Sequence, residues 1–264
     1  MRQYLLPDTF EGEDHVLLTG KESQYLVKVL RLKIAQHFMG RDREGKVWDL
    51  CLESIGKNNC VLGCRVPDAG EPLVSTDVLP SYSGPYPHLF LYQCLCKGKK
   101  NEQIVRQATE LGVEEIVLLT STYCTKEFSK KNDKNLGGQK DRLEGQIKEA
   151  IQQSGSPIPT HLHQEMLPLT SFPQHWNNRG LSLFFHQSER ADQKSLTQLL
   201  SNHPIESPVA LLVGSEGGFS EEECNFLEAA GCKPVLLNTN ILRAETAALY
   251  GLSAIQVVLT EREN

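Results

Sequence analysis

The second part of the chain alternates short apolar runs with amphipathic segments, and this alternation restricts the possible folds more than any other feature. Apolar runs typical of buried strands cover residues 89–96, 115–120, 181–185, 209–213 and 234–237. Segments with helical spacing of apolar residues cover 101–111, 141–153, 195–200, 220–230 and 245–258. Strands that alternate with helices in this way predict an α/β domain with a mostly parallel sheet.

The first part of the chain has a different pattern, with short strands joined by tight turns. Strands are expected at 3–6, 15–19, 37–40, 46–55 and 60–66. One helix is expected after residue 19, because Thr19 and Glu22 have the spacing of a capping box. Leu26, Val29 and Leu30 continue this segment with helical spacing. Hairpins of this kind in fewer than 80 residues predict a small β-barrel.

A proline-rich stretch separates the two parts. Prolines stand at positions 67, 72, 80, 85 and 87, with serine and glycine between them, which is the composition of a linker. We therefore predict a β-barrel domain at 1–72, a linker at 73–87 and an α/β domain at 88–264. A chain of 264 residues is long enough to form two cores without metals or disulfides.

Composition and charge exclude several classes of protein. Apolar residues make up 39% of the chain, and no run approaches the ~20 apolar residues of a membrane helix. The N-terminal segment lacks the form of a secretory signal. The net charge is −6, and residues 176–264 hold six basic and eleven acidic side chains. Because a general polyanion binder is basic, any contact with nucleic acid must use local patches.

Eight cysteines are present, and none forms a Cys-x-x-Cys pair. A zinc knuckle would need tighter pairing, so we expect no metal site. Reduced and mostly buried thiols in a cytosolic protein are expected instead.

Three loops follow the late strands, at residues 185–189, 212–220 and 236–246. In a parallel sheet, the loops after the carboxyl ends of the strands form the ligand site. Gly214, Gly217 and Gly218 in the second loop would let backbone amides approach a ligand closely. Their spacing is not G-x-G-x-x-G, and the loop lacks the Lys-Ser/Thr of a P-loop. Ser220 and Glu223 form a capping box for the helix that follows, so a plain strand–helix turn also fits this loop.

The third loop places Arg243 near the start of a helix, where its charge opposes the helix dipole. A cation in that position suggests a ligand. The alternative is a surface salt bridge with Glu245.

Together, the second and third loops resemble the C-terminal signature of the SPOUT class of RNA methyltransferases. They are most similar to the RsmE family, which methylates N3 of a uridine in 16S ribosomal RNA. The matching residues are Val213-Gly214-x-Glu216-Gly217-Gly218-Phe219-Ser220 and Ile241-Leu242-Arg243-x-Glu245-Thr246-Ala247. Upstream segments similar to family elements lie at 29–32, 96–100, 109–113 and 150–155. The resemblance therefore extends over nearly the whole chain.

The resemblance implies a PUA-like RNA-binding β-barrel followed by a SPOUT α/β domain with a C-terminal trefoil knot. It also implies S-adenosylmethionine as cofactor, in a pocket made by the three loops, and a homodimer with the active site near the subunit interface. The residues that it implies for cofactor binding are His186, Gln187, Val213, Gly214, Glu216, Gly217, Gly218, Leu237, Asn238, Leu242, Arg243, Thr246 and Ala247.

The chemistry of such a reaction suggests two catalytic residues. Uridine N3 carries a proton, and its loss puts negative charge on N3, O2 and O4. Arg243 is the candidate cation for these oxygens, because a guanidinium forks two acceptors and stays charged. Glu216 is the candidate base, or an orienting partner for Arg243.

The expected RNA partner is 16S rRNA or the assembled small ribosomal subunit, in the cytoplasm. The target base must leave its stack to expose N3. Basic residues near the family elements are the expected RNA contacts, with 126–134 as a second basic patch: Arg2, Arg31, Lys97, Lys99 and Lys100.

Four positions depart from the usual family pattern. Ser215 replaces Pro, Asn238 and Asn240 replace Gly and Arg, and Ser156 replaces Arg. Asn238 and Asn240 leave open a SPOUT methyltransferase for another RNA position or base. A non-catalytic RNA-binding module is a further alternative, and the intact Gly214, Gly217, Gly218 and Arg243 argue against it. A Rossmann-type oxidoreductase would need G-x-G-x-x-G after residues 89–96, which the sequence lacks.

Overall fold

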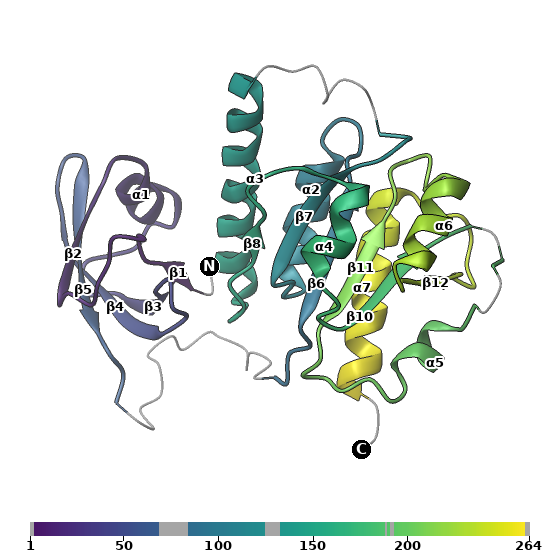
Figure 1. Cartoon of the computed structure of the whole chain (residues 1–264). Helices are drawn as coiled ribbons and strands as arrows, with labels where there is room; N and C mark the ends of the chain where they lie inside the picture. The colour runs from purple at the N-terminus through teal and green to yellow at the C-terminus, as the bar shows by residue number, and fades with distance from the viewer. Residues whose placement is uncertain (1–2, 69–83, 125–132, 188, 191–192, 262–264) are drawn as a thin grey trace. The chain divides into compact units, whose positions relative to one another are not determined.

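The computed structural model describes residues 3–68, 84–124, 133–187, 189–190 and 193–261. The chain divides into two compact units, which Figure 1 colours by residue number. The first unit contains Met1–Tyr82 and also Ile151–Pro159, and the second contains Ser83–Ala150 and Thr160–Asn264. Most of the predicted linker lies outside the described residues, so the domain limits given above stay a prediction.

The first unit is built on a curled five-stranded sheet. Its strand order is β1 (Tyr4–Leu5), β3 (His37–Arg41), β4 (Val47–Ile55), β5 (Asn59–Arg65) and β2 (His15–Thr19). All pairs are antiparallel except β1 with β3. No ladder joins β1 to β2 within the described residues, so the small β-barrel predicted from the hairpins is present as a curled sheet, a half-barrel. With two residues, β1 is too short to close the sheet.

The helical segment of the first unit differs from its prediction. Helix α1 (Gly20–Gln24) leads into a π-helical turn, η1 (Tyr25–Val29), and Leu26 is fully buried while Val29 is 66% exposed. Thr19 precedes α1, but its side chain makes no capping hydrogen bond, so the predicted capping box is wrong. We attribute this to Gly20, whose φ of +58° takes the first turn out of helical geometry.

The second unit contains a parallel sheet, as predicted. Its order is β12 (Lys233–Val235), β10 (Leu181–Phe185), β11 (Val209–Val213), β6 (Leu89–Cys94), β7 (Glu115–Thr120) and β8 (His161–Leu162), and β9 (Leu167–Pro168) also pairs with β7. Strands β6 and β11 are buried along their whole length, which explains their continuous apolar sequences.

Helices cover both faces of this sheet (Figure 1). Helix α7 (Ala244–Glu261) packs against α2 (Lys100–Glu110), α5 (Leu196–Leu200), β6 and β11. The apolar side chains of η2 (Leu169–Ser171), α4 (Phe172–Trp176) and α6 (Glu221–Ala229) pack in a separate core with Phe90, Tyr92 and Phe184 of the sheet. The two cores fix the strands, and therefore also the loops at their carboxyl ends.

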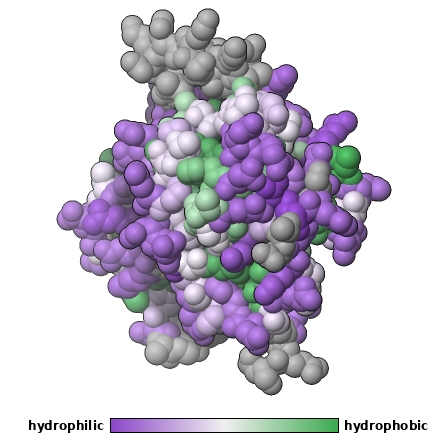
Figure 2. Space-filling view, turned by 45° about the vertical axis from the view of Figure 1, so that its right-hand side comes forward, coloured by the Kyte–Doolittle hydropathy of each residue, from purple (hydrophilic) through white to green (hydrophobic). Residues whose placement is uncertain are grey.

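The helix predicted at 141–153 begins earlier than expected, within the polar sequence before residue 135. Helix α3 spans Asp133–Ser154, so the predicted loop at 126–134 ends by residue 132, and residues 125–132 lie outside the described residues. No helix in the described part of the chain is long and apolar enough to cross a bilayer. Figure 2 shows a mostly hydrophilic face with a narrow band of apolar and neutral residues along its middle.

Candidate functional site

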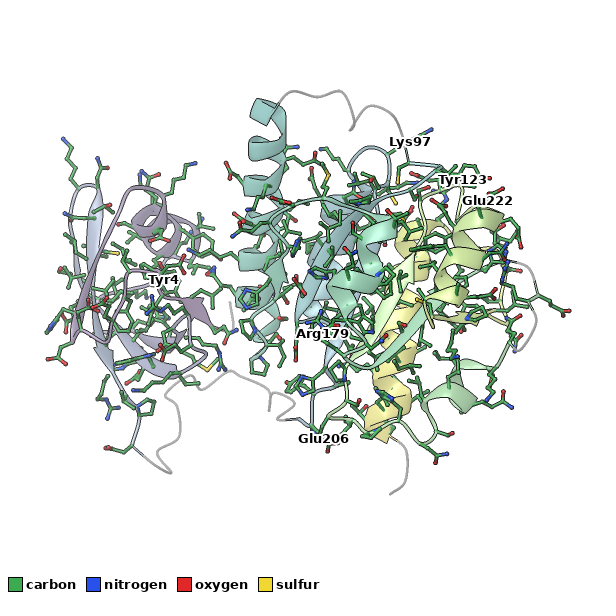
Figure 3. The ribbon with its side chains drawn as sticks, in the orientation of Figure 1. Tyr4, Lys97, Tyr123, Arg179, Glu206 and Glu222 are labelled. Carbon is green, nitrogen blue, oxygen red and sulfur yellow. The ribbon has the colours of Figure 1, made fainter. Side chains whose placement is uncertain are left out.

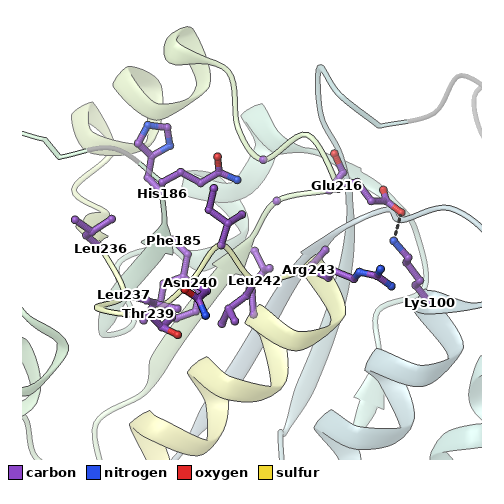
Figure 4. Close-up of a pocket in the computed structure, with 18 residues that line it drawn as sticks. Lys100, Phe185, His186, Glu216, Leu236, Leu237, Thr239, Asn240, Leu242 and Arg243 are labelled. Carbon is purple, nitrogen blue, oxygen red and sulfur yellow. Dashed lines mark hydrogen bonds and ion pairs between the residues drawn. The ribbon is translucent and has the colours of Figure 1, made fainter.

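A cavity of about 390 Å³ lies where the three predicted loops meet, beyond the ends of β10, β11 and β12 (Figure 4). Such a volume is in the range of small-molecule sites. Of the residues predicted to bind a cofactor, ten line this cavity: His186, Gln187, Val213, Gly214, Glu216, Gly218, Leu237, Leu242, Arg243 and Ala247. Further lining residues are Lys100, Phe185, Ser215, Leu236, Thr239, Asn240, Ile241 and Ala244. We call this hollow the loop cavity.

The loop after β11 makes a tight bend at one wall of the loop cavity. The Gly218 N–H donates to the Ser215 carbonyl at 2.9 Å, and Gly218 has a φ of +71°. A Cβ on Gly214 would lie 2.7 Å from the Gly218 carbonyl carbon, so this approach needs glycine. The bend leads to Ser220, which forms the predicted capping box with Glu223 at the start of α6. The backbone of the bend is therefore held close to the cavity.

Three predicted cofactor residues do not line the loop cavity. Gly217 faces the other way, because a Cβ there would lie 2.7 Å from the Cβ of Tyr123. Asn238 and Thr246 are exposed to solvent. Motif matching selected these residues with their neighbours, but the backbone of each loop directs only some of its residues inward.

Arg243 immediately precedes α7 and accepts the Ala247 N–H on its carbonyl at 2.8 Å. Its side chain is exposed at the loop cavity and has no hydrogen-bond or ion-pair partner among the described residues. The salt bridge with Glu245, which was the alternative for this arginine, is not formed. Glu245 instead lies 3.5 Å from Lys100 Nζ. The guanidinium is therefore available to a ligand.

Glu216 is held by the loop before α2 (Figure 4). Its carboxylate accepts from Lys100 Nζ at 2.8 Å and from the Lys97 N–H at 3.0 Å. Partial burial opposes ionisation, but these hydrogen bonds outweigh it, and the pKa of Glu216 lies below its ordinary value. The predicted pairing of Glu216 with Arg243 is replaced by a pair with Lys100. A carboxylate with a lowered pKa is also a weaker base.

Lys100 is the lining residue whose role the sequence did not suggest. It was predicted to contact RNA, but it stands between Glu216 and Glu245 at the loop cavity. Those residues are more than 110 positions away along the chain, so no local pattern could have indicated the contact.

The loop after β10 is anchored to α6. His186 Nδ1 lies 3.4 Å from Cys224 Sγ, and burial, helped by the nearby Arg190 charge, lowers the pKa of His186. Arg190 Nε donates to Glu228 at 2.7 Å, and its Nη1 donates to Glu221 at 2.9 Å. These bonds fix the loop after β10, which forms one wall of the loop cavity.

The remaining predicted RNA contacts are dispersed. Arg31, Lys97 and Lys99 are exposed, whereas Arg2 lies outside the described residues. Arg31 belongs to the first unit, and the two lysines belong to the second. All eight cysteines are free thiols, as expected.

Comparison with known protein families now assigns both units. The family described as RNA methyltransferase domain matches residues 84–256, which is more than half of the chain. The chain belongs to the RNA methyltransferase family. The family described as RNA methyltransferase PUA domain matches residues 18–63, within the curled sheet.

Individual members of this family match along most of the chain. Ribosomal RNA small subunit methyltransferase E of Rickettsia conorii is 27% identical, and the match covers 97% of this chain and 95% of the relative. The Bacillus subtilis protein of the same name is 25% identical, with coverage of 90% and 88%. These matches confirm the family predicted from the second and third loops.

Solved structures have the same fold. Ribosomal RNA small subunit methyltransferase E from Neisseria gonorrhoeae, bound to S-adenosylmethionine, is 21% identical with a TM-score of 0.77 over 100% of both chains. A Legionella pneumophila protein solved with the same cofactor is 23% identical with a TM-score of 0.79 over 97% of both chains. At these identities the likeness shows the fold alone, a PUA-like unit together with an α/β unit in one chain.

Proposed function

We propose that this protein is an S-adenosylmethionine-dependent methyltransferase that acts on N3 of a uridine in 16S rRNA of the small ribosomal subunit. The observation that carries the proposal is the convergence of the three loops on one cavity, with the glycine bend on one side and, on another, Arg243, which has no side-chain partner among the described residues. The relatives named for methylation of small-subunit ribosomal RNA support the same substrate class.

The residues of the loop cavity fit the cofactor. The glycine bend leaves a backbone wall that any Cβ on Gly214 would disturb, and Ser215 Oγ is buried without a partner among the described residues. Val213, Leu237 and Leu242 add apolar surface and backbone groups for a nucleoside. When bound, S-adenosylmethionine supplies a methyl group on a positively charged sulfur.

The protein's own residues then prepare the uridine. Arg243 stabilises the negative charge that develops on a carbonyl oxygen beside N3, O2 or O4, as the N3 proton passes to solvent water at the open side of the loop cavity, because no described side chain neutralises its guanidinium. Lys100 and Glu216 tie the loop at 96–100 to the glycine bend, which fixes one side of the opening. We assign Glu216 this positioning role, because its lowered pKa disfavours proton abstraction.

The proposal extends to the assembly and topology of the chain. We propose a cytoplasmic homodimer in which α7 contributes to the interface, since Tyr250 and Val257 are 47% and 49% exposed seven residues apart. Ile241, at the rim of the loop cavity, is 79% exposed and would lie close to the same interface. The return of α7 from the edge strand β12 to β6 and β11 is compatible with a trefoil knot.

Two measurements test the activity. Calorimetry with S-adenosylmethionine should give binding to the purified protein. Small subunits from cells that lack this enzyme should gain 3-methyluridine in their 16S rRNA when incubated with protein and cofactor, as measured by mass spectrometry of nucleosides. Arg243→Ala should retain cofactor binding within a few-fold and lose transfer by about 10²-fold or more.

Each alternative has its own outcome. Another methylated nucleoside in place of 3-methyluridine would assign the enzyme to a different RNA position. Absence of cofactor binding would leave a non-catalytic RNA-binding module. Full activity of Arg243→Ala would remove this arginine from the mechanism.

A further inference from the structure

The amino end of β7 holds a group of side chains that the proposed function does not use. Glu115, His163 and His175 each offer one ligand-type atom, and these atoms lie within 4.8 Å of one another. We call these three residues the His–Glu cluster. Glu115 is the first residue of β7, His163 follows β8, and His175 lies in α4. The loop cavity lies at the carboxyl ends of the parallel strands. The cluster therefore lies at the opposite end of the strands, where β7 begins.

The distances in the His–Glu cluster are close to those of a metal site. His163 Nδ1 lies 3.2 Å from Glu115 Oε1, and His175 Nε2 lies 3.9 Å from the same oxygen. Two ligand atoms on a tetrahedral zinc ion, each about 2.0–2.1 Å from the metal, are roughly 3.4 Å apart. Small side-chain movements would therefore bring all three atoms to bonding distance.

The far atoms of the cluster are already engaged. Tyr92 OH lies 2.8 Å from His175 Nδ1, which leaves Nε2 directed toward Glu115. Arg179 Nη2 lies 3.8 Å from Glu115 Oε2, so the two carboxylate oxygens face different partners. The Arg179 guanidinium also lies over the rings of Phe90 and Trp176, at 4.7 and 4.8 Å. Partners of this kind orient metal ligands in proteins.

Partial burial leaves the His–Glu cluster accessible to an ion from solvent. The three side chains are 21–26% exposed, so solvent can deliver an ion but does not surround them. Figure 3 labels Arg179 below Lys97 and above Glu206 in the second unit.

We propose that Glu115, His163 and His175 bind a divalent transition metal of the zinc class, with one coordination position left for water. Two imidazoles and one carboxylate suit Zn²⁺ better than Mg²⁺ or Ca²⁺, which prefer oxygen ligands. The ion would join β7, the segment after β8 and α4. The sequence suggested no metal site, because the ligands are 12 and 48 residues apart.

Calorimetric titration of tag-free, chelator-treated, full-length protein with Zn²⁺ tests the site. One equivalent should bind, and Co²⁺ should give the visible absorption of a protein-bound ion. His163→Ala and Glu115→Gln should each weaken Zn²⁺ binding by about tenfold or more. Tyr92→Phe keeps all three ligands and should weaken it by about tenfold. The matched control is His161→Ala, an exposed histidine on β8, which should bind as the wild type does.

Absence of Zn²⁺ binding in the wild type would overturn the proposal. Binding that is unchanged in both His163→Ala and Glu115→Gln would also overturn it. Thermal unfolding of the metal-free proteins shows whether a variant fails to fold. If His163→Ala fails to fold, Zn²⁺ binding to Glu115→Gln, whose side chain has the same shape as glutamate, decides whether the site exists. Cofactor binding at the loop cavity is measured separately, so neither proposal depends on the other.

Discussion

At the scale of single residues, Lys100 sets the charge distribution of the loop cavity. It lies between the carboxylates of Glu216 and Glu245, and this leaves Arg243 without an acidic partner in the described structure. Without Lys100, the carboxylates of Glu216 and Glu245 would face the opening with Arg243 as the one cation among the described lining residues. One lysine from the start of α2 thus keeps an arginine from the start of α7 available.

Replacement of Lys100 tests this effect. In Lys100→Met, the released carboxylates should attract Arg243, so we expect kcat to fall by about tenfold while the affinity for S-adenosylmethionine changes less. Lys100→Arg keeps the charge and should retain most of the activity. Steady-state kinetics and calorimetry on both variants measure the difference, and equal kcat for Lys100→Met and wild type would contradict the prediction.

Arg190 gives a pH-dependent prediction at the same scale. Its guanidinium lowers the pKa of Glu228 below the ordinary value of 4.5. A lowered carboxyl pKa stabilises the fold above pH 4.5, and this stabilisation is lost as the pH falls through the folded-state pKa. Arg190→Met should therefore lower the free energy of unfolding by about 1.5–3 kcal/mol at pH 7 and reduce its acid-side decrease. Denaturant unfolding between pH 3 and 7 measures the free energy of unfolding and its pH dependence. If this free energy fell equally steeply toward acid pH in wild type and variant, Arg190 would not be the cause of the lowered Glu228 pKa.

At the scale of elements, two helical glycines differ in what surrounds them. A Cβ on Gly251 of α7 would lie 2.4 Å from the Phe185 ring and 2.8 Å from Leu211, so the helix packs closely on the sheet there. A Cβ on Gly145 of α3 would meet nothing within 4 Å. The first glycine is required by packing, and the second only lowers helix propensity.

The same substitution should therefore have opposite effects at these two positions. Gly251→Ala should lower the free energy of unfolding by about 1–3 kcal/mol through overpacking. Gly145→Ala should raise it by about 1 kcal/mol through helix propensity. Chemical denaturation of both variants against wild type gives the signs. A stabilising Gly251→Ala would mean that Phe185 moves aside at little cost.

The elements also show how far sequence reasoning reached. β7, β10 and β11 match their predicted limits, because each is a short, mostly apolar run that ends at polar or turn-forming residues. β8 and β9 were missed, since two-residue strands carry no periodicity. α4 was missed for a related reason: it spans five residues and begins with Phe172-Pro173.

Lining residues of the loop cavity could be predicted only where a loop carried a recognisable motif of its own. Glycine spacing and Arg243 identified the second and third loops, and these do meet at the cavity. The contribution of Lys100 and the outward direction of Gly217 depend on contacts with residues distant in sequence. Such contacts depend on how helices and strands pack together, and this packing cannot be predicted from the sequence of one loop.

At the scale of the whole molecule, the proposed dimer gives a further prediction. Tyr250 and Val257 form an exposed apolar pair on α7 that a second copy of the chain would cover. Tyr250→Glu should convert the dimer to a monomer, because burial of an unpaired carboxylate opposes association. Light scattering after size-exclusion chromatography measures the mass. Val66→Glu, at a residue 44% exposed in the first unit, is the matched control and should leave the mass unchanged. A wild-type monomer would contradict the proposed dimer.

The discontinuity of the first unit bears on how the chain is made. Gln3 donates its side-chain amide to the carbonyls of Ile151 and Ser156, at 3.0 and 2.8 Å, and is itself fully buried. During translation, the amino-terminal strands emerge well before these acceptors, and the Gln3 amide stays hydrated until they arrive. The first unit therefore completes its folding only after residue 159 has been synthesised, when the Ser83–Ala150 part of the second unit has also been made.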